Sequence, residues 1–151
     1  MQLCGVFVAL GEERLKQLLA RVSIGKLKTY QLYDRVKARL HVAKLNSETL
    51  PKAAPRAWAR LTEQDEEFAK DLAQAILVSN LDLLRAVLDF VGIPHEDGFF
   101  AKEMDASAYL KDDWQRRVWD HFHETQPEAP LLLYINHLAW ELTKEPQVFL
   151  P

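Results

Sequence analysis

Cysteine and glycine are scarce in this chain, which has one cysteine and five glycines in 151 residues. The single cysteine, Cys4, excludes an internal disulfide framework and fits a reducing compartment. The scarcity of glycine favours helices over a turn-rich β fold, and we find no glycine-rich phosphate-binding loop. These absences predict a cytoplasmic helical protein, and we expect no cofactor.

Long apolar runs are also missing from the sequence. The opening segment LCGVFVAL, residues 3–10, lacks a positively charged flank and is too short to span a bilayer. We interpret it as a packed terminal segment whose valines and phenylalanine admit an extended conformation. No later apolar run without charges approaches the length of a transmembrane helix, so we expect no membrane association.

The charges are divided unevenly along the chain, although the net charge is only −3. Residues 11–60 carry twelve Lys/Arg and four Asp/Glu, whereas residues 61–151 carry seven and eighteen. The apolar share of 48% is ordinary for a globular protein, and the length suits one domain spanning residues 1–151. We therefore expect one domain with a basic amino-terminal part and an acidic carboxyl-terminal part.

Apolar residues recur at helical spacing along most of the chain. This pattern predicts helices over 12–24, 30–46, 62–78, 81–91, 109–124 and 131–143, with 46–61 as a structured connector. The count is five or six, because the stretch 62–92 forms either one helix or two. Gly25 is the expected stop of the first helix, and Gly92 that of the helix that begins near residue 81.

The segment near residues 81–91 is apolar on nearly every side. A helix of this kind must be covered by other helices, so we expect it to be buried at the centre. The predicted fold class is therefore all-α, a compact single-domain bundle.

Histidines and carboxylates on the last two predicted helices are the candidate metal ligands. Asp120 and His123 are three residues apart, and His137 and Glu141 are four apart. Facing helices that each offer a carboxylate and a histidine can hold a metal. The spacings do not match the paired Glu-x-x-His pattern of di-metal bundles, so the favoured interpretation is surface histidines with a buried His137. A metal-dependent enzyme is the third functional hypothesis.

A basic segment at residues 14–60 provides the second hypothesis, nucleic-acid binding. Arg35, Lys37, Arg39 and Lys44 lie on one predicted helix and could contact phosphates. The competing interpretation is that these side chains pack against the acidic part of the chain and neutralise it.

Aromatic residues in irregular segments are candidate contacts for a protein partner or for self-association. Trp58 lies close to two prolines, and Phe99 and Phe100 follow the predicted Asp97-Gly98 turn. The loop residues at 95–97 are polar, which suits a solvated turn as well as a site. Since no complete catalytic motif is present, the leading hypothesis is a small cytoplasmic binding or interaction protein without catalytic activity.

Overall fold

The computed structural model describes residues 2–101 and 103–151, and within these ranges the regular structure is entirely helical. The helices are α1 (Leu3–Leu10), α2 (Glu12–Ala20), α3 (Ile24–Thr29), α4 (Tyr33–Leu40), α5 (Thr49–Lys52), α6 (Ala54–Thr62), α7 (Glu66–Val78), α8 (Leu81–Val91), the 3-10 helix η1 (Ala106–Tyr109), α9 (Trp114–Phe122) and α10 (Glu128–Leu142). The all-α prediction is confirmed. No helix in the described ranges is long and apolar enough to cross a membrane.

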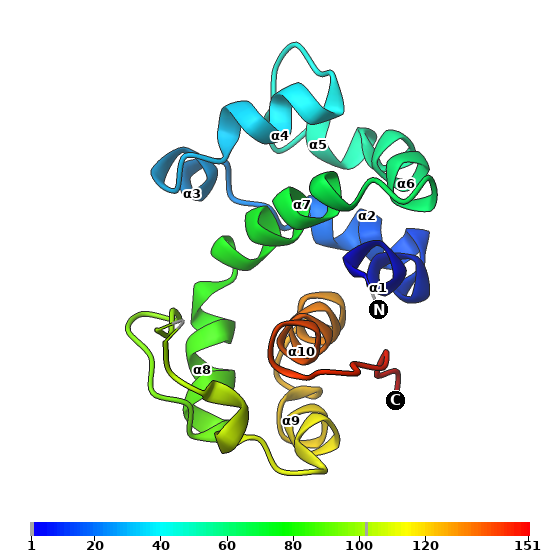
Figure 1. The fold of residues 1–151 in the computed structure, drawn as a ribbon. Helices are drawn as coiled ribbons and strands as arrows, with labels where there is room; N and C mark the ends of the chain where they lie inside the picture. The colour runs from blue at the N-terminus through cyan, green and yellow to red at the C-terminus, as the bar shows by residue number, and fades with distance from the viewer. Residues whose placement is uncertain (1, 102) are drawn as a thin grey trace.

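Helix α7 divides the fold into two sides (Figure 1). Helices α3 to α6 lie on one side of α7, and α8, α9 and α10 lie on the other. Helix α10 packs against α1, α2, α7 and α9, and so joins the last part of the chain to the first.

The buried apolar residues form two clusters. The amino-terminal cluster consists of buried residues between Leu3 and Val78 together with Ala129, Leu132 and Leu133 of α10. The carboxyl-terminal cluster consists of Leu77 and buried residues of α8, α9, α10 and the intervening segment. Helix α10 therefore contributes to both clusters, and a different face of the helix packs into each of them.

The most enclosed helix is α10 rather than the predicted helix near residues 81–91. Every residue from Ala129 to Asn136 is buried. Helix α8 instead has one buried face and one solvent-exposed face, on which Asp82 and Asp89 are exposed and Phe90 is 37% exposed. The sequence pattern overstated the burial of α8 because its few charged residues fall on one side of the cylinder.

The predicted helix at 30–46 is wrong in its bounds. Gln31 adopts a left-handed conformation with φ 60°, which separates α3 from α4, and His41 with φ 54° ends α4. Gly25 was expected to stop a helix over 12–24, but α2 ends at Ala20 and Gly25 lies inside α3. Short helices separated by left-handed residues explain why the total exceeds five or six.

The opening segment is a helix, not an extended strand. The side chain of the N-cap residue, Gln2, does not cap α1. Instead, the Glu66 carboxylate accepts hydrogen bonds from the backbone N–H groups of Leu3 and Cys4, each at 2.9 Å. A helix start leaves backbone donors without partners, and a carboxylate is a favourable acceptor there. Here that acceptor comes from α7, far along the chain.

The stretch 62–92 forms two helices. Asp65 caps α7 by accepting from the Phe68 N–H at 3.1 Å, and Gly92 with φ 85° closes α8. Between the helices, the side chains of Ser79 and Asn80 donate to the carbonyls of Ala75 and Ile76, both at 2.7 Å. These bonds satisfy carbonyls at the end of α7 and allow the chain to turn into α8.

Candidate functional site

A cleft of about 370 Å³ lies between the two sides of the fold. Helices α7, α8 and α10, the turn after α3 and the loop after α8 supply its walls. The apolar part of the lining consists of Leu32, Leu77, Val78 and Leu84, and the aromatic part of Tyr30, Phe99, Phe100 and Tyr134. A mainly apolar hollow of this size is typical of small-molecule sites.

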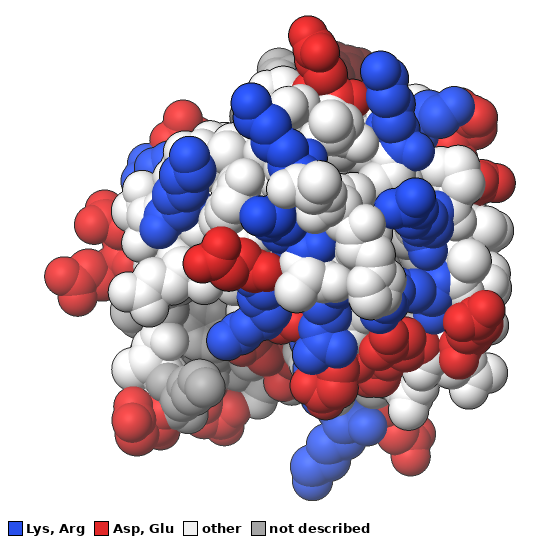
Figure 2. Space-filling view, turned by 90° about the horizontal axis from the view of Figure 1, so that it is seen from above, with Lys and Arg blue, Asp and Glu red and all other residues white. Residues whose placement is uncertain are grey.

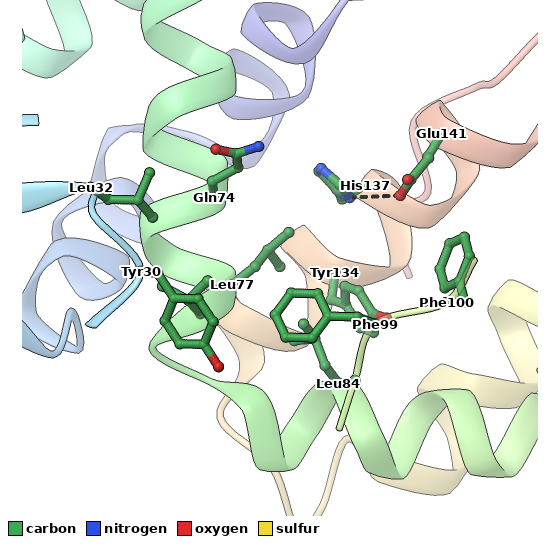
Figure 3. Close-up of a pocket in the computed structure, with 12 residues that line it drawn as sticks. Tyr30, Leu32, Gln74, Leu77, Leu84, Phe99, Phe100, Tyr134, His137 and Glu141 are labelled. Atoms are coloured by element: carbon green, nitrogen blue, oxygen red, sulfur yellow. Dashed lines mark ion pairs between the residues drawn. The ribbon is translucent and has the colours of Figure 1, made fainter. Parts of the chain in front are cut away.

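The polar lining is confined to a few side chains, mainly Gln74, His137 and Glu141. In the view of Figure 3 these three lie along the upper side of the cleft, Tyr30 and Phe99 lie along the lower side, and Phe100 lies at the right, below Glu141. Gln74 comes from α7, while His137 and Glu141 are one turn apart on α10. A ligand in the cleft would therefore meet aromatic rings on one side and polar groups on the other.

A tight turn at residues 96–99 places Phe99 in the cleft wall. The backbone of Glu96 and Phe99 exchanges two hydrogen bonds, of 2.7 and 3.0 Å. Asp97 and Gly98 both have positive φ, 53° and 92°, the conformation that two-residue hairpin turns favour for Asp-Gly. The predicted turn at Asp97-Gly98 is present, and a Cβ at residue 98 would lie only 3.5 Å from Leu84 Cβ on α8.

His95 holds this turn against α8. The Gly98 N–H donates to Nδ1 of His95 at 3.0 Å, so Nε2 carries the ring proton and donates to Asp89 Oδ1 at 2.7 Å. Both ring nitrogens are thus used in structure. The polar loop singled out in the sequence serves to position Phe99 and Phe100.

His137 lines the cleft, and its ring holds a buried polar atom. Its Nδ1 has no hydrogen-bond partner among the described residues, and Oε2 of Glu141 lies 3.7 Å away, beyond hydrogen-bonding distance. Burial lowers the pKa of His137 to about 4, which leaves the ring neutral at pH 7. The ring also packs against Trp140, with centroids 5.4 Å apart. A neutral imidazole of this kind can exchange a hydrogen bond with a ligand.

The buried side chain of Tyr134 interacts electrostatically with the Glu141 carboxylate. Burial first, and then the negative charge of Glu141, raise the pKa of Tyr134 far above its usual range. Tyr134 is therefore a neutral phenol that lies within the field of Glu141. Among the described residues that line the cleft, Glu141 is the only charged one.

The four candidate nucleic-acid contacts separate into two kinds. Arg39 Nε and Arg35 NH1 lie 2.8 and 3.3 Å from the carboxylate of Asp71, which is buried on α7. Lys37 and Lys44 have no ion pair among those found in the described ranges. Figure 2 shows the face above α3 to α6, on which Lys and Arg side chains are interspersed with Asp and Glu.

The candidate metal ligands do not gather into one site. Asp120 lies 3.9 Å from Arg116, and His123 stacks on Trp119 with ring centroids 5.3 Å apart. In the described ranges no group of three His, Cys, Asp or Glu residues lies close enough to hold a metal ion. Of this set, His137 and Glu141 instead meet in the cleft.

The candidate interaction residues lie in two places. Trp58 is partly buried against the amino-terminal cluster. Phe99 is 47% exposed, whereas Phe100 packs partly against the carboxyl-terminal cluster. Phe99 and Phe100 therefore share the cleft with His137 and Glu141, a grouping that the sequence analysis did not propose.

No protein-family model, curated protein or solved structure matches this chain.

The sequence analysis missed Gln74 and Tyr134 as parts of the cleft. Both lie on helices whose apolar stripes predict burial, and nothing in a single sequence indicates that their helices diverge to leave a hollow. The one available signal was Asn136 and His137, two polar residues within an otherwise apolar run.

Proposed function

We propose that this protein is a non-catalytic binding protein whose cleft takes a small, largely apolar molecule. The observation that carries this proposal is the cleft itself, about 370 Å³ with apolar and aromatic walls and a few polar side chains, among them His137. Small-molecule sites usually have apolar walls of this kind, with a few polar side chains that orient the ligand.

The binding role is favoured over a catalytic one by the state of the imidazole. A general base works best with a pKa near the operating pH, whereas burial holds the pKa of His137 at about 4. Its Nδ1 is also 3.7 Å from Glu141, beyond hydrogen-bonding distance. A neutral ring positioned in this way suits recognition of a ligand.

The test uses a neutral fluorescent apolar probe, N-phenyl-1-naphthylamine, and a variant that blocks the cleft from an exposed position. Gln74 is exposed yet lines the cleft, so Gln74→Trp fills the opening without changing the core. Lys70→Trp is the matched control, because Lys70 is exposed on the same helix but does not line the cleft. We expect saturable binding of one probe, weakened about tenfold or more by Gln74→Trp and hardly changed by Lys70→Trp.

The proposal fails if the probe does not saturate, or if the two tryptophan variants weaken its binding equally. Activity that depended on His123 or His137 would contradict the non-catalytic role.

A second candidate function is nucleic-acid binding by the face above α3 to α6. Figure 2 supports it by the number of Lys and Arg side chains on this face, and Lys37 and Lys44 have no ion pair in the described ranges. The pairing of Arg35 and Arg39 with Asp71 opposes it, because that charge is compensated within the fold.

Fluorescence anisotropy with labelled single- and double-stranded DNA and RNA tests this candidate. Phosphate contacts predict affinity that falls steeply with salt, and that falls further when Lys37 and Lys44 are both changed to Gln. Absence of salt-sensitive binding excludes it.

A further inference from the structure

The charge and the rings of the cleft specify the chemistry of its occupant. On one side stands the Glu141 carboxylate, at the end of the polar row formed with Gln74 and His137. On the other side stand the rings of Phe99, Phe100 and Tyr30, and Tyr30 and Phe99 are in contact, with centroids 5.8 Å apart. Aromatic faces and carboxylates both attract cations.

We infer that the occupant of this cleft is an organic cation, an amine or quaternary ammonium group on an apolar body. The inference rests on the proposed binding function and adds the class of ligand. The ammonium group would lie between Glu141 and the aromatic rings, and the apolar body would contact Leu77 and Leu84.

The surroundings of the carboxylate agree with this assignment. Glu141 is exposed at the edge of the cleft, and its negative charge adds to burial in raising the pKa of Tyr134. His137 is neutral at pH 7 and so does not oppose a cation with a charge of its own. Arg85, which packs beside the turn at Gly98, directs NH1 to Asp82 at 2.7 Å. A carboxylate accepts several hydrogen bonds, so Glu141 can hold a ligand alongside its neighbours in the protein.

Anionic ligands fit the cleft less well. A carboxylic acid would place its charge beside Glu141, and like charges in a partly buried site repel each other. A neutral ligand would fill the apolar part but would gain nothing from the carboxylate. Affinity should therefore be highest for a cationic head group, lower for a neutral one and lowest for an anionic one.

The experiment compares three ligands with one naphthylmethyl body and different heads: trimethylammonium, its neutral isostere tert-butyl with the same shape, and carboxylate. Affinities are measured by calorimetry on the unmodified protein, on Glu141→Gln, and on Glu124→Gln. Glu124 is an exposed glutamate that does not line the cleft, so it is the matched control.

We expect the unmodified protein to bind the ammonium ligand about tenfold more tightly than the neutral isostere, and the carboxylate most weakly. Glu141→Gln should remove the preference for the ammonium head, and Glu124→Gln should retain it. The comparison of heads on the unmodified protein needs no variant, so a folding defect in Glu141→Gln cannot obscure the result.

Equal binding of the ammonium and neutral ligands, or tightest binding of the carboxylate, overturns the cation inference and leaves the cleft as a binding site. A preference that survives Glu141→Gln also overturns it. If none of the three ligands binds, the proposed function falls together with the inference.

Discussion

Nε of Arg39 lies 2.8 Å from Oδ2 of Asp71, and this ion pair ties α4 to α7. The residue Asp71 is only 8% exposed, and Arg35 approaches its other oxygen at 3.3 Å. Part of the basic charge of residues 11–60 is therefore compensated inside the fold by the acidic part. A carboxylate that is largely buried depends on such partners for its stability.

The first prediction concerns this pair. Arg39→Gln should lower the free energy of unfolding by about 2 kcal/mol, because it leaves Asp71 with only the longer contact to the exposed Arg35 side chain. Arg35→Gln should lower it by less than about 1 kcal/mol, since the Arg35 side chain is 56% exposed. Urea unfolding of the two variants measures the difference, and equal losses would show that burial of Asp71 does not govern the pair.

The second prediction concerns Asn136, which fastens the carboxyl-terminal tail to α10. Its side chain is fully buried, donates to the carbonyls of Leu132 and Phe149, and accepts from the Phe149 N–H at 2.7 Å. Asn136→Ala should lower the free energy of unfolding by about 2–3 kcal/mol and expose residues 143–151 to proteases.

Asn46→Ala is the matched control for this experiment. The Asn46 side chain accepts only from Glu48 and Thr49 nearby, so its loss should weaken the start of α5 and leave the tail protected. Limited proteolysis followed by mass spectrometry distinguishes the two outcomes. A tail that stays protected in Asn136→Ala would mean that Phe149 is held by packing alone.

The third prediction is a dependence of stability on pH. The folded protein holds the pKa of His137 at about 4, below the unfolded value of 6.5, so the unfolded chain binds more protons between these values. Stability from this residue is therefore complete above pH 6.5 and is lost as the pH falls towards 4, by roughly 3 kcal/mol. His137→Gln should flatten the unfolding free energy across this window, and an unchanged slope would assign the pH dependence to other groups.

The fourth prediction compares two glycines. Gly98→Ala should lower the free energy of unfolding by about 1–2 kcal/mol, because residue 98 has φ 92°, a backbone conformation that strains any residue with a Cβ. Gly25→Ala should raise it by about 0.5–1 kcal/mol, since Gly25 lies within α3 and an added Cβ finds ordinary contact at 3.9 Å. Thermal unfolding of both variants gives the two signs, and the same sign for both would contradict the assigned conformation of the turn.

Sequence reasoning located the elements that carry their own signals. The end of α8 at Gly92 was predicted, since this residue acts on neighbours a few positions away. Helix α7 was predicted to begin at residue 62, but Thr62 ends α6 and α7 begins at Glu66 with Asp65 as its N-cap. Helix α1 could not be predicted in this way, because its acceptor, Glu66, is supplied by α7. Gln31 and His41 break the predicted helix at 30–46 without being glycine or proline, so their residue types gave no warning.

The sequence predicted some residues of the cleft but not that they lie together. His137 and Glu141 were noted as metal candidates, and Phe99 and Phe100 as contacts for a partner. Their convergence depends on the turn at 96–99 folding back against α8 and α10, which is a property of tertiary packing. The pairing of Arg35 and Arg39 with Asp71 likewise needed a structure, although internal compensation of the basic segment was one of the two alternatives that the charge pattern left open.

The sharing of α10 between the two clusters has a consequence for the order of events during synthesis. The amino-terminal cluster spans Leu3 to Val78 but is closed by Ala129, Leu132 and Leu133. The ribosome delivers these last residues only after about fifty more have emerged behind Val78. Until then, the faces of α1 and α2 that pack on α10 lack this partner, so we expect the amino-terminal cluster to complete its packing only after α10 has been synthesised.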